Sequence, residues 1–254
     1  MIGVFDSGVG GLSVLREIRI ALPRADLLYV ADRARAPYGP RSLAEVQSFS
    51  GEIARWLIGH GATTLVVACN TASAAALDEL RADHPSLPIV GMEPAVKPAA
   101  ALTATGVIAV FATAATFQGR LFESVVSRFG HGARVIERAC PEWVELVEAG
   151  RVDDSGVERA VTACLGPALE AGADALVLGC THFSFLRPVI DRVSGGSATV
   201  IDPAPAVAKQ TARVAPGTNE SGGLRMAASG DLERFADLAR ELAGLTADTI
   251  LAYP

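Results

Sequence analysis

The chain has 254 residues, half of them hydrophobic and a fifth charged, which is typical of a globular protein with an ample core. Its formal net charge of −6 argues against a general nucleic-acid binder. We find no signal-peptide pattern and no apolar run long enough to cross a bilayer, so we expect a cytoplasmic protein with no membrane partner. The cysteines lack the spacing of a disulfide framework, and we expect reduced thiols at Cys69, Cys140, Cys164 and Cys180.

The N-terminal stretch is typical of a strand, a glycine turn and a helix. An apolar run, residues 1–5, ends on Asp6 and Ser7, and residues 8–11 read Gly-Val-Gly-Gly before apolar residues recur with helical spacing. Glycines let a ligand approach the backbone, and a helix N-terminus can hold an anion. The G-x-G-G spacing differs from a dinucleotide fingerprint. It favours a loop for a carboxylate or small anion, with a tight turn capped by Asp6 as the alternative.

A loop follows the second expected strand, residues 27–30. Two prolines and a glycine fix its conformation between residues 32 and 40. Loops at strand ends often carry function, so Arg33 and Arg35 could meet a carboxylate.

The rest of the chain alternates between strand and helix signals, which indicates mainly parallel sheets with helices on both faces. The first expected helix runs from Ser42 to Gly59, with a capping box to Glu45. We expect further strands at 64–68, 88–92, 106–111, 133–137, 175–179 and 199–202, and a last strand at 224–228. We expect further helices at 72–80, at 117–129, from Cys140, at 153–171, at 186–193, at 203–214 and at 232–242, the last capped by Asp231. An alanine- and proline-rich crossing at 94–104 and a polar loop at 216–223 complete the chain.

Two of the expected strands end on a cysteine, Cys69 and Cys180, each with a threonine within two residues. Cys69 lies 63 positions after Asp6, and Cys180 lies 64 positions after Thr116. This spacing predicts an α/β fold of two pseudo-symmetric three-layer lobes with the active site in the cleft between them. We assign residues 1–95 plus 205–254 to a discontinuous first lobe and 96–204 to the second. Ligands bind at the carboxyl ends of such strands.

The two thiols allow three chemistries. They could form a redox disulfide, or Cys180 could act as a nucleophile with His182 as its base. They could also carry protons on opposite faces of one carbon, which uses both thiols and suits pseudo-symmetric lobes. Both cysteines stand where a strand meets a helix N-terminus, so we expect lowered thiol pKa values. We interpret Cys140 and Cys164 as small buried hydrophobes.

Four motifs in order closely resemble those of bacterial glutamate racemases, within the aspartate/glutamate racemase superfamily. They are Val4-Phe-Asp-Ser-Gly-Val-Gly-Gly11, Asp32 followed by Pro37-Tyr38-Gly39, Ala68-Cys-Asn-Thr-Ala72 and Gly179-Cys-Thr-His182. The likeness runs from Ile2 to about Gln210. It implies interconversion of L- and D-glutamate, without a cofactor or metal, to supply D-glutamate for peptidoglycan. A homodimer is also implied. Within the superfamily, aspartate or another amino acid is the alternative substrate, and a Cys-His thiol hydrolase is the alternative of a different class.

The resemblance also implies the roles of individual residues. Cys69 and Cys180 would be the catalytic acid/bases, with Asp6 assisting the first and Glu148 and His182 the second. The substrate contacts would be Asp6, Ser7, Tyr38, Gly39, Asn70, Thr71, Thr113, Thr116 and Thr181. Because the two thiols have different helpers, we expect the two directions of reaction to respond differently when one helper is changed.

The chain departs from the family pattern at three places. Arg33 stands where Thr or Ser is usual, Phe183-Ser184 where Tyr-Pro is common, and Asp202-Pro203 where Asp-Ser is frequent. Arg33 lies near the expected pocket and bears on substrate identity. A long N-terminal extension that binds an activator in some relatives is missing, so we do not expect that regulation.

Overall fold

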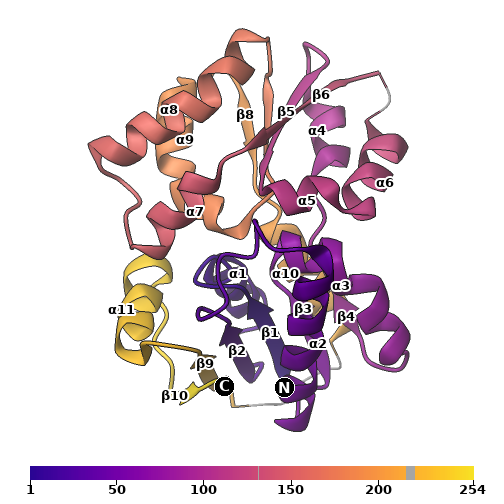
Figure 1. Ribbon diagram of the computed structural model, residues 1–254, viewed down its shortest axis with the longest axis vertical. Coiled ribbons are helices and arrows are strands. Elements are labelled where there is room, and N and C mark those ends of the chain that lie inside the picture. Colours follow the sequence, from indigo (N-terminus) through magenta and orange to yellow (C-terminus); the bar gives the residue numbers. More distant parts are fainter. Residues whose placement is uncertain (131, 216–220) are drawn as a thin grey trace.

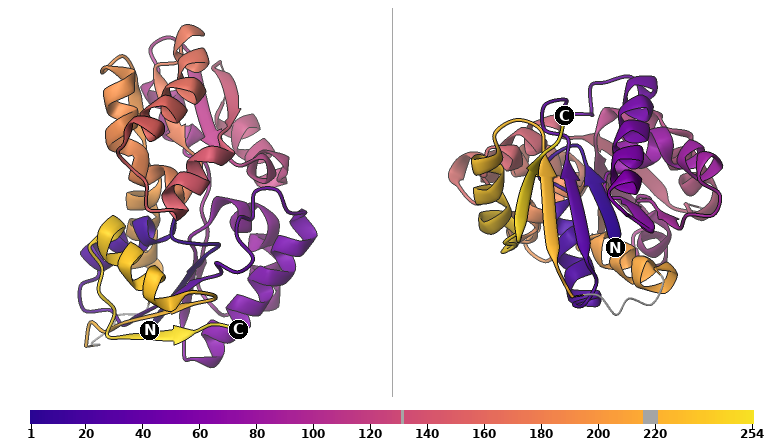
Figure 2. Two further views of the ribbon diagram at one scale, coloured as in Figure 1. Left: turned by 60° about the vertical axis from the view of Figure 1, so that its left-hand side comes forward. Right: turned by 90° about the horizontal axis from the view of Figure 1, so that it is seen from below.

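The protein folds into two α/β lobes, which lie one above the other in Figure 1. The structure, a computed structural model, describes residues 1–130, 132–215 and 221–254. The lower lobe contains the N-terminal segment and also the C-terminal segment in yellow, while the upper lobe contains the middle of the chain (Figures 1 and 2). In the described ranges no helix is long and apolar enough to cross a membrane.

The first lobe is built on a parallel sheet with the strand order β10-β9-β2-β1-β3-β4. The strands are β1 (Ile2–Asp6), β2 (Leu27–Ala31), β3 (Thr64–Val67), β4 (Ile89–Val90), β9 (Leu224–Ala228) and β10 (Thr249–Ala252). Side chains alternate between two cores, as the strand period requires. One core includes helices α1 (Leu12–Ala21), α10 (Ala204–Val214) and α11 (Leu232–Ala243), and the other α2 (Leu43–Gly59) and α3 (Asn70–Asp83).

The second lobe has a parallel sheet with the order β6-β5-β7-β8. Its strands are β5 (Val107–Ala112), β6 (Arg134–Ala139), β7 (Ala175–Leu178) and β8 (Thr199–Ile201). Helices α4 (Val96–Leu102) and α6 (Arg120–Phe129) share a core with one face, and α7 (Pro141–Glu148), α8 (Ser155–Glu170) and α9 (Arg187–Ser194) with the other. The short helix α5 (Ala114–Gln118) and the 3₁₀ helix η1 (Thr181–Leu186) follow the carboxyl ends of β5 and β7.

The two sheets correspond strand by strand. The order β2-β1-β3-β4 in the first lobe matches β6-β5-β7-β8 in the second, and β9 and β10 extend only the first sheet. The predicted α/β fold with two pseudo-symmetric lobes is therefore confirmed, and β3 and β7, which lead to the two cysteines, occupy equivalent positions. The exact lobe boundaries at 95/96 and 204/205 stay a prediction.

The strands β1, β2, β3 and β7 are buried along their whole length, because helices cover both faces of each sheet. One core cluster continues from the first lobe into the second, where α1 meets η1. In that cluster Trp143 stacks on Phe111, meets Phe183 edge-on and donates its indole N–H to the Ala160 carbonyl. This shared core holds α7 and η1, which carry half of the candidate site.

Two predicted elements were wrong. Leu224–Ala228 is not the last strand, because Thr249–Ala252 forms β10 at the sheet edge, half-exposed and without a clear apolar alternation. The helix expected over 117–129 is broken at Gly119, whose backbone is extended. A Cβ at position 119 would lie 2.7 Å from the Cβ of Ala74 on α3, so the break lets the lobes approach closely. Residues 216–220 of the expected polar loop lie outside the described residues.

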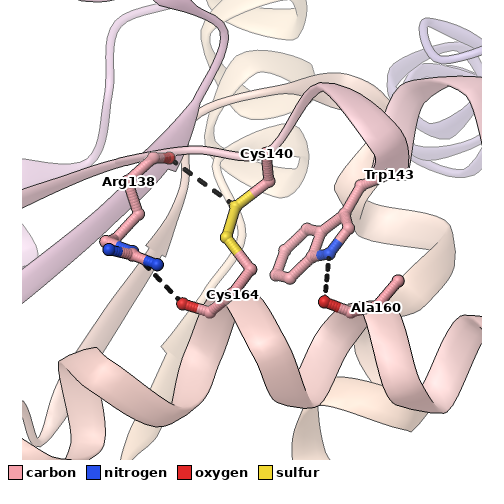
Figure 3. The surroundings of a disulfide bond; sticks show 5 residues. All are labelled: Arg138, Cys140, Trp143, Ala160 and Cys164. Carbon is pink, nitrogen blue, oxygen red and sulfur yellow. Dashed lines mark hydrogen bonds between the residues drawn. A yellow bond between two sulfur atoms is a disulfide. The ribbon is translucent and has the colours of Figure 1, made fainter.

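The expectation of reduced thiols was also wrong for one pair of cysteines. Cys140 and Cys164 form a disulfide, with Cα atoms 6.5 Å apart (Figure 3). Cys140 directly precedes α7, and Cys164 lies on α8, which packs beside α7 through the Trp143–Ala160 hydrogen bond. Only this helix packing, which the sequence spacing does not reveal, brings the two sulfurs together. Cys69 and Cys180 are free.

We expect the unfolded protein to expose two reactive thiols before reduction and four after it, as counted by thiol titration in denaturant. Because the disulfide closes a loop of about 25 residues, reducing it should lower the free energy of unfolding by about 3 kcal/mol. Urea denaturation with and without a thiol reductant measures this, and a Cys164→Ala variant serves as the permanently open control. Four reactive thiols before reduction would contradict the pairing.

Candidate active site

A cavity of about 360 Å³ lies at the carboxyl ends of the strands, between the lobes. Its volume is in the range of small-molecule sites. Ten of the predicted site residues line it: Ser7, Tyr38, Gly39, Cys69, Asn70, Thr71, Thr113, Cys180, Thr181 and His182. The other three predicted residues, Asp6, Thr116 and Glu148, stand behind this wall, where they contact residues that line it.

Cys69 belongs to the first lobe. It follows β3 and caps the N-terminus of α3, where its sulfur accepts the Ala72 N–H at 3.4 Å. The buried carboxyl of Asp6, at the end of β1, accepts the Gly11 N–H at 2.6 Å and the Thr181 hydroxyl at 3.3 Å. Burial and the nearby Asp6 raise the pKa of the Cys69 thiol well above its usual range. Our expectation of a lowered pKa was wrong here, because desolvation outweighs the helix N-terminus.

Cys180 belongs to the second lobe and has a different partner. Its sulfur lies 3.6 Å from Nδ1 of His182, and Nε2 of His182 lies 2.7 Å from Oε1 of Glu148 on α7. Burial alone would lower the pKa of His182, but its hydrogen bonds to Cys180 and Glu148 raise that pKa well above the usual value. The arrangement therefore favours an imidazolium between a sulfur and a carboxylate.

The glycine turn after β1 lies directly against this pair. A Cβ at Gly8 would lie 1.8 Å from Oε1 of Glu148, and one at Gly10 would lie 2.3 Å from Nδ1 of His182. The Val9 N–H between them donates to Glu148 at 2.7 Å. The turn thus does hold a carboxylate, as its pattern suggested, but the carboxylate is the protein's own.

Three threonine hydroxyls meet across the lobe boundary. Thr71 on α3 lies 2.8 Å from Thr113 and 3.3 Å from Thr116, and the latter two are 2.9 Å apart. Hydroxyls both donate and accept and can rotate toward a ligand. This cluster can therefore bind a polar group in the cavity without a net charge.

The loop after β2 forms another wall of the cavity. Tyr38 lines it, but its hydroxyl donates to Asp32, which also pairs with Arg35 at 2.7 Å. The guanidinium of Arg35 stacks over Phe49 at 4.3 Å. Tyr38 is thus anchored at its polar end, and it is the ring and the neighbouring Gly39 that face the ligand space.

Buried polar atoms without a hydrogen-bond partner concentrate here. Of the four such side-chain atoms among the described residues, Oδ1 of Asp6 and Oδ1 of Asn70 belong to this site. Since buried acceptors are nearly always paired, Oδ1 of Asn70, which lines the cavity, marks a place for a donor of a ligand. In the described ranges no group of three or more His, Cys, Asp or Glu residues could hold a metal ion.

Sequence reasoning missed part of the site. Pro141, Val144 and Glu145 of α7 also line the cavity. Glu145 and Glu148 are three residues apart, so helical spacing could have placed both on one side of α7. Arg33 does not line the cavity, but it meets a carboxylate, as its loop position suggested: it pairs with Glu148 at 3.5 Å, although the sequence did not identify this partner.

Two related α/β lobes that each bring a free thiol to one cavity define an amino-acid racemase, and comparison with known proteins gives the same class. The chain belongs to the Asp/Glu/Hydantoin racemase family, whose profile matches residues 2–211. Within that family it is 47% identical to a glutamate racemase of Roseiflexus sp. over 95% of this chain and 91% of the relative. It is 46% identical to one of Ectopseudomonas mendocina over 92% of this chain and 91% of the relative.

Solved structures give the same result. The Escherichia coli glutamate racemase, in complex with L-glutamate and the activator UDP-MurNAc-Ala, superposes with a TM-score of 0.88 at 32% identity, covering 99% of this chain and 97% of that one. A glutamate racemase isoform of Bacillus anthracis gives 0.87 at 33% identity, covering 100% and 97%. A Picrophilus torridus aspartate racemase gives 0.51 at 16% identity over 84% and 92%, a likeness of fold alone.

We expect alkylation of Cys69 in a Cys180→Ala variant to show a pH midpoint above that of a free thiol, because burial and Asp6 disfavour the thiolate. Mass spectrometry after timed iodoacetamide treatment gives the midpoint, and a free thiol with a pKa of about 8.5 is the reference. Limited access would lower the rate at every pH without moving the midpoint. A midpoint at or below that of the reference thiol would contradict the assignment.

Gly10→Ala should displace His182 and lower racemase activity at least about a hundredfold, since its Cβ would lie 2.3 Å from the ring. Gly59→Ala is the matched control, because a Cβ there meets nothing within 4 Å. Activity and thermal melting of both variants are compared. A Gly10→Ala protein with full activity would show that His182 need not lie where the structure has it.

Proposed function

We propose that this protein interconverts L- and D-glutamate without a cofactor, and that Cys69 and Cys180 exchange the α-proton. One observation carries the proposal: two free, buried thiols line a single cavity from equivalent strand ends of two related lobes. A redox disulfide between them or a single nucleophile would leave this symmetry without a purpose.

The reaction needs one thiolate and one thiol. The thiolate removes the α-proton from one face of the substrate, the C–H electron pair stays on the α-carbon, and the opposite thiol protonates that carbon on the other face. A new C–H bond to the proton of the second thiol replaces the C–H bond that was broken. The net change is inversion of configuration at the α-carbon. Each sulfur ends with the proton state of the other, and the reverse reaction uses the same pair.

Polar groups around the cavity can bind the amino acid. The unpartnered Oδ1 of Asn70, which lines the cavity, suits the α-ammonium. Backbone N–H groups at the start of α3 and the surrounding hydroxyls suit the carboxylates, and they stabilise negative charge as it spreads from the α-carbon. We assign these contacts to Asp6, Ser7, Tyr38, Gly39, Asn70, Thr71, Thr113, Thr116 and Thr181.

The helpers differ between the two thiols. Asp6 assists Cys69, and the His182–Glu148 pair assists Cys180. Burial and Asp6 favour the neutral thiol at Cys69, whereas the Cys180 sulfur lies 3.6 Å from the ring of His182. The two thiols therefore have unequal surroundings.

Glutamate as the substrate is supported by the relatives. The Escherichia coli structure contains L-glutamate, and a Francisella tularensis glutamate racemase that is 25% identical to this chain contains D-glutamate. We further propose that the product supplies peptidoglycan synthesis in the cytoplasm and that the enzyme is a homodimer. Light scattering of the purified protein tests the dimer. Within the family, aspartate is the alternative substrate.

A thiol hydrolase is the alternative of a different class, and one observation favours it. Cys180, His182 and Glu148 form a nucleophile–base–carboxylate series like those of cysteine hydrolases. That activity would not need Cys69. The two functions therefore predict opposite results for a change at Cys69.

The test is proton exchange in D₂O without added cofactor. With L-glutamate we expect loss of the α-hydrogen NMR signal together with appearance of D-glutamate, and a much slower reaction with L-aspartate. Cys69→Ser and Cys180→Ser should each lower racemisation at least about a thousandfold, with unchanged thermal melting. An active Cys69→Ser enzyme, or no exchange with either amino acid, would refute the two-thiol racemase.

A further inference from the structure

Arg33 reaches the Cys180 half of the site from the opposite lobe. It follows β2 in the first lobe, and its Nε lies 3.5 Å from Oε2 of Glu148, which belongs to α7 of the second lobe. The side chains are only 18% and 20% exposed. The Nε is buried without a hydrogen-bond partner, so the carboxylate of Glu148 is the group that compensates its charge.

The guanidinium is held from behind. Its Nη1 donates to the Asp231 carbonyl at 3.3 Å, at the start of α11. The next residue, Ala34, donates its N–H to the Ser229 hydroxyl at 2.9 Å. Arg33 is therefore fixed by the C-terminal part of the first lobe, and it meets the one carboxylate oxygen of Glu148 that His182 and Val9 do not use.

We propose that Arg33 is a positioning residue for this reaction: it clamps Glu148 across the lobe boundary, so that the carboxylate stays ionised and directed at Nε2 of His182. This role rests on the proposed racemase function. It makes the acid–base behaviour of Cys180 depend on a residue that touches neither the substrate nor the sulfur.

The surrounding charges fix the sign of the effect. Glu148 faces the cations Arg33 and His182, and His182 also faces Cys180 and the buried Asp6. Burial opposes ionisation of Glu148, but His182, the Val9 N–H and Arg33 together lower its pKa. Because Arg33 is one of the groups that lower the pKa of Glu148, its removal should raise that pKa and leave less carboxylate to pair with His182.

The first experiment compares Arg33→Met, Arg33→Lys and a control, Arg16→Met. Arg16 is a half-exposed arginine of α1 whose ion-pair partner is its neighbour Glu17. In Arg33→Met we expect the acid limb of the kcat/KM profile to move up by about one pH unit, which is tenfold in kcat/KM on that limb. Arg33→Lys should restore most of the shift, and Arg16→Met should match the wild type. If Arg33→Met does not fold, Arg33→Gln is used in its place.

The second experiment is a double-mutant cycle with Glu148→Gln. If Arg33 acts through Glu148, then Arg33→Met will have no further effect on activity or on the pH profile once Glu148 is neutral. Additive losses, or an Arg33→Met profile that matches the wild type, would overturn the proposal. The NMR titration midpoint of His182 gives a readout besides activity, and it should fall in Arg33→Met, because a less ionised Glu148 stabilises the imidazolium less.

The two proposals fail in different ways. If the wild-type protein does not exchange the α-proton of glutamate, the proposed function is wrong. If the wild type racemises glutamate and Arg33→Met keeps its pH profile, the function stands and the role of Arg33 is wrong.

Discussion

The site depends on how closely the glycine turn after β1 approaches the Glu148–His182 pair. Any side chain at Gly8 or Gly10 would occupy the place of the carboxylate or the imidazole. The Val9 N–H between them donates a hydrogen bond to Glu148 and so fixes this carboxylate of the second lobe from the first lobe. The turn therefore does two things at once: it ends β1 with Asp6 beside the first thiol, and it positions the acid–base pair of the second.

The same topology gives the two thiols unequal surroundings. Cys69 and Cys180 each follow the equivalent strand of a matching sheet, β3 or β7. Cys69 then meets a buried carboxyl, which disfavours a second negative charge, and Cys180 meets an imidazole held by Glu148. Proton transfer between opposite faces of a substrate requires one sulfur with a proton and one without. The unequal surroundings thus make the two sulfurs differ in how readily each gives up its proton.

Much of this could be predicted from the sequence, because it depends on local patterns. The apolar strands that end on Cys69 and Cys180, and their similar distances from Asp6 and Thr116, predict two related α/β lobes that meet at the thiols. What could not be predicted depends on contacts between distant segments. The Cys140–Cys164 disulfide follows from the packing of α7 on α8, and the break at Gly119 from the nearness of Ala74. The raised pKa of Cys69 follows from a depth of burial that no local pattern reveals.

The unequal helpers restrict where a direction-dependent effect can appear. Free L- and D-glutamate have equal free energies in water, and both directions pass through the same transition states. Since kcat/KM depends only on the free energy from free enzyme and substrate to the transition state, any variant must lower it equally for the two enantiomers. The different response that we expected of the two directions must therefore appear in kcat and KM separately. A change at His182 or Glu148 alters the stability of the bound state in which Cys180 holds the proton relative to the state in which Cys69 holds it. The asymmetry of the site thus governs which bound enantiomer accumulates, and it leaves the equilibrium between the free enantiomers unchanged.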